Sequence, residues 1–324
     1  MKSYWIQSQG ASTTLELRDV PVPKPGPGQL LIRMRATSLN RGELLASIAR
    51  HRADTARPAG ADAAGEVHAV GAGVNAFKPG DRVIARAIGA FAAYAIADGA
   101  LTSLMPARLS WEQAGAVPIA YITAYEAVLQ LGHLKAGEWL LVAGASSGVG
   151  VASLQVAKAA GARVIGVSGS AEKLARLKTL GLDAGIQARG GDFAVKVMAA
   201  TGGKGANLAI NLVGGTAFAD CLAALANQGR LAIVGYVDRV MKAEIDLAAV
   251  HGMRLKIFGV SNAALTPAER AEATRGFERE VLPALADGRI VPVIDRVFPF
   301  ADLPAARAYL ETDAVLGKVV VTMA

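Results

Sequence analysis

The sequence predicts a two-domain α/β protein in which a β-rich N-terminal domain precedes a doubly wound parallel sheet. The length of 324 residues fits about two domains. Short apolar segments separated by Gly and Pro occupy roughly the first 110 residues, which is typical of a compact β domain. After Ser110, apolar strands alternate with amphipathic helices, the pattern of a parallel sheet buried between helices.

The predicted N-terminal domain covers residues 1–117. Its clearest strands are Leu30 to Met34, Gly65 to Val70 and Arg82 to Ala85, and the last of these follows a Pro-Gly-Asp turn. The proline-rich segment 21–28 must be extended or turning, because proline excludes a regular helix there.

The predicted second domain covers residues 118–258, and residues 259–324 form a return segment that completes the first domain. A helix is expected to begin at Ser110 and to continue through Tyr125 towards Leu131. The segments expected to form buried strands are 139–142, 164–167, 208–210, 231–234 and 255–258, with helices at about 149–160 and 171–180. The final apolar strand, Lys318 to Val321, should pair with another sheet.

Composition excludes several classes of protein. The lone cysteine, Cys221, rules out an intrachain disulfide and a four-cysteine zinc lobe, and it fits a reducing cytoplasm. The net charge of +7 is not concentrated in a basic block with interleaved aromatics, so we expect no nucleic-acid partner. The first ten residues lack the apolar core of a signal peptide. The uncharged stretch 139–157 is interrupted by Gly144 and by a Ser-Ser-Gly turn, so we expect no membrane partner.

The most informative segment is a glycine-rich turn between a predicted strand and a predicted helix, which is the context of a dinucleotide-binding fingerprint. Glycine lets the backbone approach a pyrophosphate, and the helix N-terminus offers free N–H groups to the phosphates. The alternative is a purely structural tight turn. The cofactor-binding residues predicted here are Gly144, Ser146, Ser147, Gly148, Val149 and Gly150.

The end of the second strand favours NADPH over NADH. An NAD site usually carries a carboxylate there to hold the ribose hydroxyls. This chain instead has Ser168 and Ser170, with Lys173 one turn into the next helix, and these side chains suit a 2′-phosphate. Glu172 is the counter-argument, although helix phase should turn it away, and Lys173 as an ordinary solvated residue is the alternative.

The glycine-rich turn also resembles that of the short-chain dehydrogenases, which carry it near the N-terminus and use a Tyr-x-x-x-Lys pair. Here about 140 residues precede the turn, and none of the six tyrosines has lysine four positions later. We therefore exclude that class.

Several ordered motifs together resemble the medium-chain dehydrogenase/reductase superfamily, and the resemblance covers nearly the whole chain. These motifs lie at 60–67, 70–74, 78–83, 123–125, 144–150, 229–235 and 317–320. The resemblance implies a GroES-like N-terminal domain and a Rossmann-type cofactor domain. It also implies a homodimer formed through an edge strand of the cofactor domain.

The resemblance further implies a zinc-free member. The positions at which zinc alcohol dehydrogenases of this superfamily hold the catalytic metal fall on Asn40, Ala61 and Ile119. Neither Ala61 nor Ile119 can bind zinc, and asparagine is a poor ligand. The four histidines show no spacing typical of a metal site. We therefore predict no metal.

The chain is thus similar to the quinone oxidoreductase branch, which also has counterparts of 38–40 and 89–94. It departs from that branch at Leu45, where an aromatic residue is common, and at Ala188, where a tyrosine often touches the 2′-phosphate. Arg189 is the candidate replacement for that tyrosine. Asn40 and Thr123 are the candidate catalytic residues beside the nicotinamide. The residues expected to line the nicotinamide pocket are Gly235, Tyr236, Ser261 and Asn262.

The predicted reaction is hydride transfer from NADPH to a quinone or another small α,β-unsaturated carbonyl, because conjugation delocalises the arriving charge without a metal. An alternative is an enoyl-thioester reductase, for which Arg50, His51, Arg52 and Arg57 would offer a basic groove. A second alternative is a non-catalytic NADPH-binding protein.

Overall fold

The computed structural model describes residues 1–9, 12–44, 55–262, 265–312 and 314–323. The chain divides into two compact units. The first comprises residues 1–122, 266–286 and 291–324, and the second comprises residues 123–265 and 287–290. The predicted class, mixed α/β with a β-rich N-terminal domain and a Rossmann-type sheet, is confirmed.

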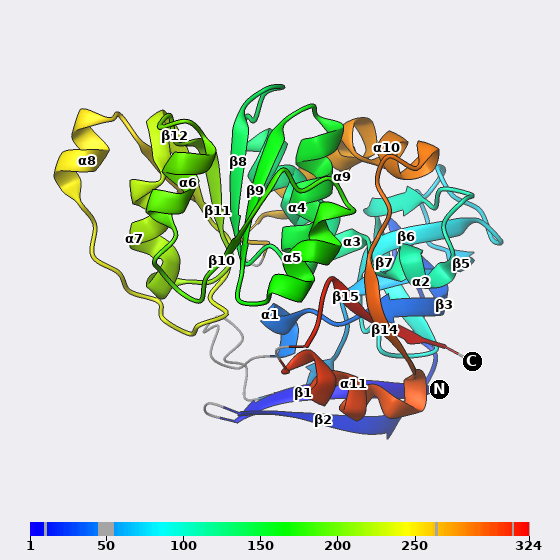
Figure 1. Ribbon diagram of the computed structural model, residues 1–324. Helices are drawn as coiled ribbons and strands as arrows, with labels where there is room; N and C mark the ends of the chain where they lie inside the picture. Colours follow the sequence, from blue (N-terminus) through cyan, green and yellow to red (C-terminus); the bar gives the residue numbers. More distant parts are fainter. Residues whose placement is uncertain (10–11, 45–54, 263–264, 313, 324) are drawn as a thin grey trace. The chain divides into compact units, whose positions relative to one another are not determined.

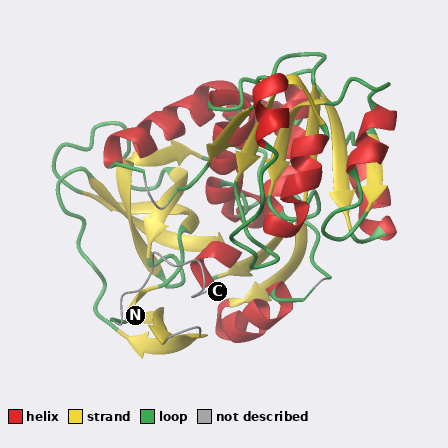
Figure 2. Ribbon diagram, turned by 90° about the vertical axis from the view of Figure 1, so that its left-hand side faces the viewer, coloured by secondary structure: helices red, strands yellow, loops and turns green. Residues whose placement is uncertain are grey.

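The first unit is built on a sheet with the strand order β14-β15-β3-β5-β6-β7 (Figure 2 shows the strands in yellow). Strand β7 also pairs antiparallel with β3, so that β3, β5, β6 and β7 close on themselves around an apolar core. The predicted strands are confirmed within longer ones. The strands of this sheet are β3 (Gln29–Ser38), β5 (Asp62–Val70), β6 (Arg82–Ile88), β7 (Tyr94–Leu104), β14 (Ile294–Pro299) and β15 (Lys318–Thr322).

The C-terminal strands pair with the N-terminal strands. Residues 320–322 of β15 pair antiparallel with residues 36–38 of β3, and β14 adds to the far edge of β15. A second sheet has the order β2-β1-β4, with β1 (Lys2–Gln9), β2 (Ser12–Asp19) and β4 (Arg57–Pro58). The helices of this unit are α1 (Arg41–Leu44), α2 (Trp111–Gly115), α9 (Pro267–Glu280), α10 (Leu282–Asp287), η2 (Phe300–Asp302) and α11 (Leu303–Leu310).

The second unit is a six-stranded parallel sheet with the order β10-β9-β8-β11-β12-β13. This is the doubly wound order 3-2-1-4-5-6, in which the chain starts at the centre and fills one half of the sheet before the other. Helices α4 and α5 lie on one side of the strands and α6 and α7 on the other (Figure 1). The strands are β8 (Trp139–Ala143), β9 (Arg163–Ser168), β10 (Ala184–Gln187), β11 (Ala206–Asn211), β12 (Leu225–Ile233) and β13 (Lys256–Gly259). The helices are α4 (Gly148–Ala159), α5 (Ala171–Lys178), α6 (Ala194–Ala200), α7 (Gly215–Ala223) and α8 (Leu247–Gly252).

One predicted helix is wrong in extent. Its start is confirmed, because Ser110 and Gln113 form a capping box. The helix then stops at Gly115 and restarts as α3 (Pro118–Tyr125), which passes into a π-helical turn, η1 (Glu126–Gln130). The break follows from Pro118, which lacks an N–H group and disfavours helical geometry in the residue before it.

The long uncharged stretch 139–157 is strand β8, the glycine-rich turn and most of α4, as predicted. The described helices include none with the length and apolar character needed to cross a bilayer.

Candidate functional site

The glycine-rich turn lies at the centre of the parallel sheet of the second unit. It connects β8 to α4, and β8 is flanked by β9 on one side and by β11 on the other. After β8 the chain builds one half of the sheet with β9 and β10. It then crosses to the other side of β8 and builds the second half from β11. In open parallel sheets this switch point, at the carboxyl ends of the strands, is where ligands bind.

The turn presents backbone amides that the protein itself does not use. Ser147 caps α4 by accepting from the N–H of Gly150 at 3.1 Å. The N–H groups of Ser146, Gly148 and Val149 have no acceptor among the described residues. Free amides at the start of a 12-residue helix form an anion-binding surface, strengthened by the helix dipole.

Gly150 is required by the close approach of helix to strand. A Cβ atom at this position would lie 2.5 Å from the carbonyl oxygen of Gly144 and 2.8 Å from that of Ala145. Real Cβ atoms do not come so close to backbone oxygen atoms. Gly144 itself has a φ of 87°, which glycine adopts without strain. The turn therefore keeps its shape only with glycine at these positions.

The residues predicted to hold a 2′-phosphate gather at the end of β9. The hydroxyl of Ser168 lies 3.4 Å from that of Ser146, and Ser170 caps α5 by accepting from the N–H of Lys173 at 3.2 Å. Arg189 comes from the segment after β10 and lies against Gly169. A Cβ on Gly169 would be 2.8 Å from Cγ of Arg189 and 3.1 Å from its guanidinium carbon. This end of β9 therefore offers hydroxyls and cations instead of the carboxylate expected for NAD.

Two of the residues predicted to contact the nicotinamide are joined directly. Nδ2 of Asn262, which follows β13, donates to Oγ1 of Thr123 in α3 at 2.6 Å. Gly235 and Tyr236 follow β12, and the N–H of Gly235 donates to the carbonyl of Asn211 at 3.2 Å. Ser261 is exposed. All of these residues belong to the second unit, as does the phosphate turn.

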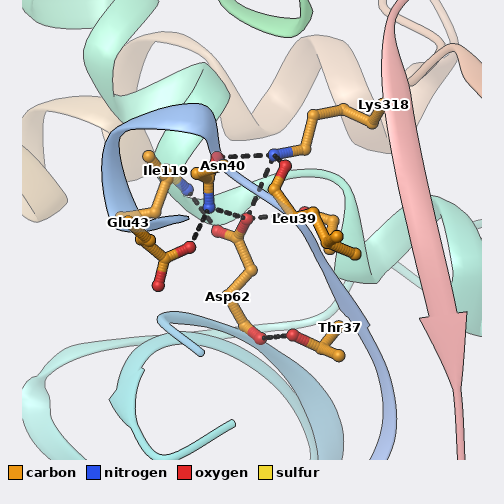
Figure 3. Close-up of polar contacts among 8 residues, drawn as sticks. Thr37, Leu39, Asn40, Glu43, Asp62, Ile119 and Lys318 are labelled. Atoms are coloured by element: carbon orange, nitrogen blue, oxygen red, sulfur yellow. Dashed lines mark hydrogen bonds and ion pairs between the residues drawn. The ribbon is translucent and has the colours of Figure 1, made fainter. Parts of the chain in front are cut away.

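Asn40 belongs to the first unit, where it is part of a polar cluster (Figure 3). Its Nδ2 donates to Oε2 of Glu43 at 2.8 Å and to Oδ2 of Asp62 at 2.9 Å. Its Oδ1 accepts from Nζ of Lys318 at 2.6 Å. Both N–H groups of the carboxamide are therefore used, and the oxygen keeps one lone pair.

Asp62 is the centre of this cluster and is fully buried. Besides Asn40, it accepts from the hydroxyl of Ser38 at 2.6 Å, from the backbone N–H of Ile119 at 2.7 Å and from the ammonium of Lys318 at 3.2 Å. Lys318 is also buried and donates to the carbonyl of Leu39 at 3.1 Å. A buried charge needs such partners, because burial without them is strongly unfavourable.

The positions that correspond to zinc ligands do converge, but on Asp62. Asn40 and the backbone of Ile119 both bind its carboxylate, and Ala61 is the residue before it. The apolar side chains of Ala61 and Ile119 offer no ligand atom. The oxygen of Asn40 already accepts a hydrogen bond from the Lys318 ammonium. The described residues contain no group of three or more His, Cys, Asp or Glu side chains that could hold a metal ion.

The surroundings of Glu43 shift the pKa of its carboxyl. Burial, followed by the negative charge of Asp62, raises the pKa of the Glu43 carboxyl to about 7. The hydrogen bond from Asn40 and the positive charges of Lys318 and Arg57 act in the opposite direction but do not outweigh burial. Elsewhere, burial raises the pKa of the Cys221 thiol, which makes it a poor nucleophile.

Sequence reasoning missed the partners of Asn40. Asp62 and Lys318 lie within the motifs at 60–67 and 317–320, whereas Glu43 lies in none of the motifs. The available signal was a carboxylate within the apolar segment Ala61–Gly65 and a lysine at the start of a Val-Val-Val strand, since buried charges require partners. Leu45, Arg50, His51 and Arg52 lie outside the described residues.

Family models match both parts of the chain. Residues 26–106 match the alcohol dehydrogenase GroES-like domain, and residues 148–278 match the zinc-binding dehydrogenase family. The chain is 28% identical to human quinone oxidoreductase, over 100% of this chain and 98% of that protein. It also superposes on a structure of an NAD-dependent alcohol dehydrogenase with a TM-score of 0.87, 31% identity and full coverage of both chains.

The chain belongs to the medium-chain dehydrogenase/reductase superfamily. Within the superfamily it lies in the quinone oxidoreductase branch. A medium-chain reductase-fold neighbour, the mycobacterial protein Rv1454c complexed with NADPH, has a TM-score of 0.90 and 28% identity, covering 99% of this chain and 100% of that one. The chain also spans 14% of the length of a polyketide synthase protein, NorB of Streptomyces orinoci, to which it is 32% identical.

The raised pKa of Glu43 predicts pH-dependent stability in this medium-chain oxidoreductase. Because the folded-state pKa lies above the ordinary value of 4.5, the stabilising contribution of protonated Glu43 is full below about pH 4.5 and is lost as the pH rises through about 7. Glu43→Gln, which cannot ionise, should therefore gain stability relative to wild type between about pH 5 and pH 8. We expect a gain of at least about 1 kcal/mol in urea unfolding, since one pKa unit corresponds to about 1.4 kcal/mol. A difference that stays constant across this range would contradict the raised pKa.

Proposed function

We propose that this chain is an NADPH-dependent reductase that transfers a hydride, without a metal ion, to a quinone or another α,β-unsaturated carbonyl. The observation that carries the proposal is the pairing of two features of the second unit. One is a phosphate turn with amides that have no acceptor among the described residues, and the other is the end of β9, which has Ser168 in place of an acidic residue and lies beside Arg189. The amides of Ser146, Gly148 and Val149 suit the pyrophosphate. Arg189 against Gly169 suits a 2′-phosphate.

The cofactor supplies a hydride from its nicotinamide ring when it is bound. The protein residues have to hold that ring and exclude water. In this proposal Thr123 helps to hold the nicotinamide ring. Its oxygen accepts from Asn262, and its hydroxyl proton remains available for a ribose or carbonyl oxygen. Asn40 takes part through the remaining lone pair of Oδ1, since both of its N–H groups are used by carboxylates. It therefore accepts a hydrogen bond and does not polarise a carbonyl.

The donor set of the first unit supports a reaction without a metal. The ammonium of Lys318, at 2.6 Å from Oδ1 of Asn40, provides the positive charge among the oxygen atoms of this cluster. A divalent cation there would have to displace it. An acceptor that delocalises the charge by conjugation needs less stabilisation than a simple ketone, so quinones and enones suit this site best.

The second candidate is reduction of an enoyl thioester with the same cofactor. Identity of 32% to segments of polyketide synthases favours it. Of the basic residues predicted to form its groove, only Arg57 lies among the described residues, in β4.

The proposal extends to a homodimer in the cytoplasm. Strand β13 is one of the two edge strands of the parallel sheet, and its side chains are largely exposed. Exposed apolar side chains lie on β13 and on the segment before it, namely Val237, Val240, Met241, Ile245, Leu247 and Ile257. An open edge of this kind suits pairing with a second copy. The single buried cysteine fits a reducing compartment.

A screen of NADPH oxidation tests the function. The purified protein should consume NADPH with quinones and enones, and the same screen should include enoyl thioesters and saturated aldehydes. Turnover confined to enoyl thioesters would favour the second candidate. Stable NADPH binding without turnover on any acceptor would indicate a non-catalytic NADPH-binding protein.

Cofactor choice should depend on Lys173 and Arg189. Lys173→Ala and Arg189→Ala should each raise the KM for NADPH about five- to tenfold and leave use of NADH nearly unchanged, because charge-assisted bonds to phosphate contribute about 1.5–3 kcal/mol at most. Lys178→Ala, an exposed residue on the same helix α5, is the matched control and should change neither constant. Equal loss with both cofactors would contradict a 2′-phosphate site.

Chelation should leave the activity intact. Dialysis against a strong chelator should not lower the rate of NADPH oxidation, and metal analysis of the active protein should find only substoichiometric zinc. A rate that falls on chelation and returns with added zinc would refute the metal-free assignment.

A further inference from the structure

Two carboxyl groups share a single carboxamide in the first unit. Nδ2 of Asn40 donates one hydrogen to Oε2 of Glu43 and the other to Oδ2 of Asp62, at 2.8 and 2.9 Å. Glu43 is brought back to Asn40 by the first turn of α1, in which the N–H of Glu43 donates to the carbonyl of Asn40 at 3.1 Å. Two carboxyl groups held this close in a partly buried site disfavour simultaneous ionisation.

The surroundings of the two carboxyl groups are unequal. Asp62 accepts hydrogen bonds from Ser38, Ile119 and Asn40 and forms an ion pair with Lys318. Within the described part of the chain, Asn40 is the one side-chain donor to Glu43. The ammonium of Lys318 is paired with Asp62 and not with Glu43, so burial and the neighbouring Asp62 favour the protonated form of Glu43.

Among the described residues, the charged groups that face Glu43 come from three elements. Asp62 in β5 opposes its ionisation, whereas Lys318 in β15 and Arg57 in β4 favour it. The balance, together with burial, places the pKa of Glu43 near neutral pH, where an acid can both give up and regain a proton. Figure 3 shows the second carboxyl oxygen of Glu43 pointing away from the Asn40 amide, and no side chain of the described residues donates a hydrogen bond to it.

We propose that Glu43 is the general acid that supplies the second hydrogen in the reduction of the acceptor. This inference rests on the proposed hydride transfer. It assigns a catalytic role to a residue of the short helix α1.

The hydrogens of the other polar groups of the cluster are already bonded to protein acceptors. All three hydrogens of the Lys318 ammonium are used, by the carbonyl of Leu39, by Oδ1 of Asn40 and by Asp62. The Ser38 hydroxyl donates to Asp62. Glu43 is therefore the acid of this cluster that has a carboxyl oxygen without a partner among the described residues.

The hydride, with its two electrons, forms a new C–H bond at the β-carbon of an enone. The π electrons of the C=C bond shift towards the carbonyl oxygen, which leaves the substrate as an enolate. The O–H bond of Glu43 then breaks as a C–H bond forms at the α-carbon, which completes the saturated ketone. Glu43 is left as a carboxylate and takes a proton from water before the next turnover.

Glu43→Gln tests this assignment, because glutamine keeps the size and the hydrogen bond to Asn40 but is not an acid. With an enone substrate we expect kcat to fall about a hundredfold, the effect typical of losing a general acid, with little change in the KM for NADPH. The decrease of the rate above about pH 7 should disappear. Glu43→Asp should restore part of the rate. Glu272→Gln, an exposed residue on α9, is the matched control.

Two further readouts separate acid catalysis from a structural effect. In heavy water, wild type should place deuterium on one face of the α-carbon, whereas Glu43→Gln should give both faces because water then supplies the proton. Carbon-13 NMR of the cofactor-free protein, with the Glu43 signal identified by its loss in Glu43→Gln, should show a carboxyl that titrates near pH 7.

The outcomes distinguish the inference from the proposed function. If wild type reduces an enone and Glu43→Gln keeps the rate, the pH profile and the single-face deuteration, then Glu43 is not the acid. A Glu43 carboxyl that titrates at its ordinary value would also overturn the inference. If wild type reduces no acceptor although Glu43 titrates near neutral pH, then the proposed function is wrong, whereas the raised pKa of Glu43 is supported.

Discussion

The buried ion pair between Asp62 and Lys318 is the interaction on which the candidate site of the first unit depends. These residues are 256 positions apart in the sequence, and they begin strands β5 and β15. Their side chains are almost completely buried, at 0% and 6% exposed. Removing charges from water is costly, and a pair of this kind is tolerated because Ser38, Asn40 and the backbone of Ile119 and Leu39 satisfy its remaining hydrogen-bonding groups.

This ion pair also determines what Asn40 can do. A carboxamide has two possible orientations, which exchange its oxygen and nitrogen atoms. The ammonium of Lys318 selects the orientation with the oxygen towards it, and the carboxylates of Asp62 and Glu43 select the same one. The side chain is therefore held by three charged or acidic neighbours, and its available function is reduced to one lone pair. With both of its N–H groups engaged, Asn40 can accept a hydrogen bond from a ligand but has none left to donate.

The two units recognise charge by different means. The second unit uses backbone amides and a helix N-terminus, which need glycine because side chains would block the approach. The first unit uses ionisable side chains whose charges are set by their neighbours. Backbone groups keep the same polarity at every pH, whereas the charge of Glu43 changes near neutrality. The pH dependence that follows from Glu43 is therefore expected in the first unit.

The sequence alone determined the fold class, the strands of the parallel sheet and the phosphate turn. These features depend on local patterns: apolar runs, helix caps such as Ser110 and Ser147, and glycine at positions that exclude a Cβ. Only the tertiary structure showed that Asp62, Lys318 and Glu43 surround Asn40 and that Arg189 lies against Gly169. It also corrected the helix predicted to run from Ser110 to Leu131, which breaks before Pro118. Contacts between residues far apart in sequence, and the pKa of a carboxyl that depends on such contacts, leave no periodic pattern in the chain. Their physical cause is burial among particular neighbours, and the fold alone decides which neighbours those are.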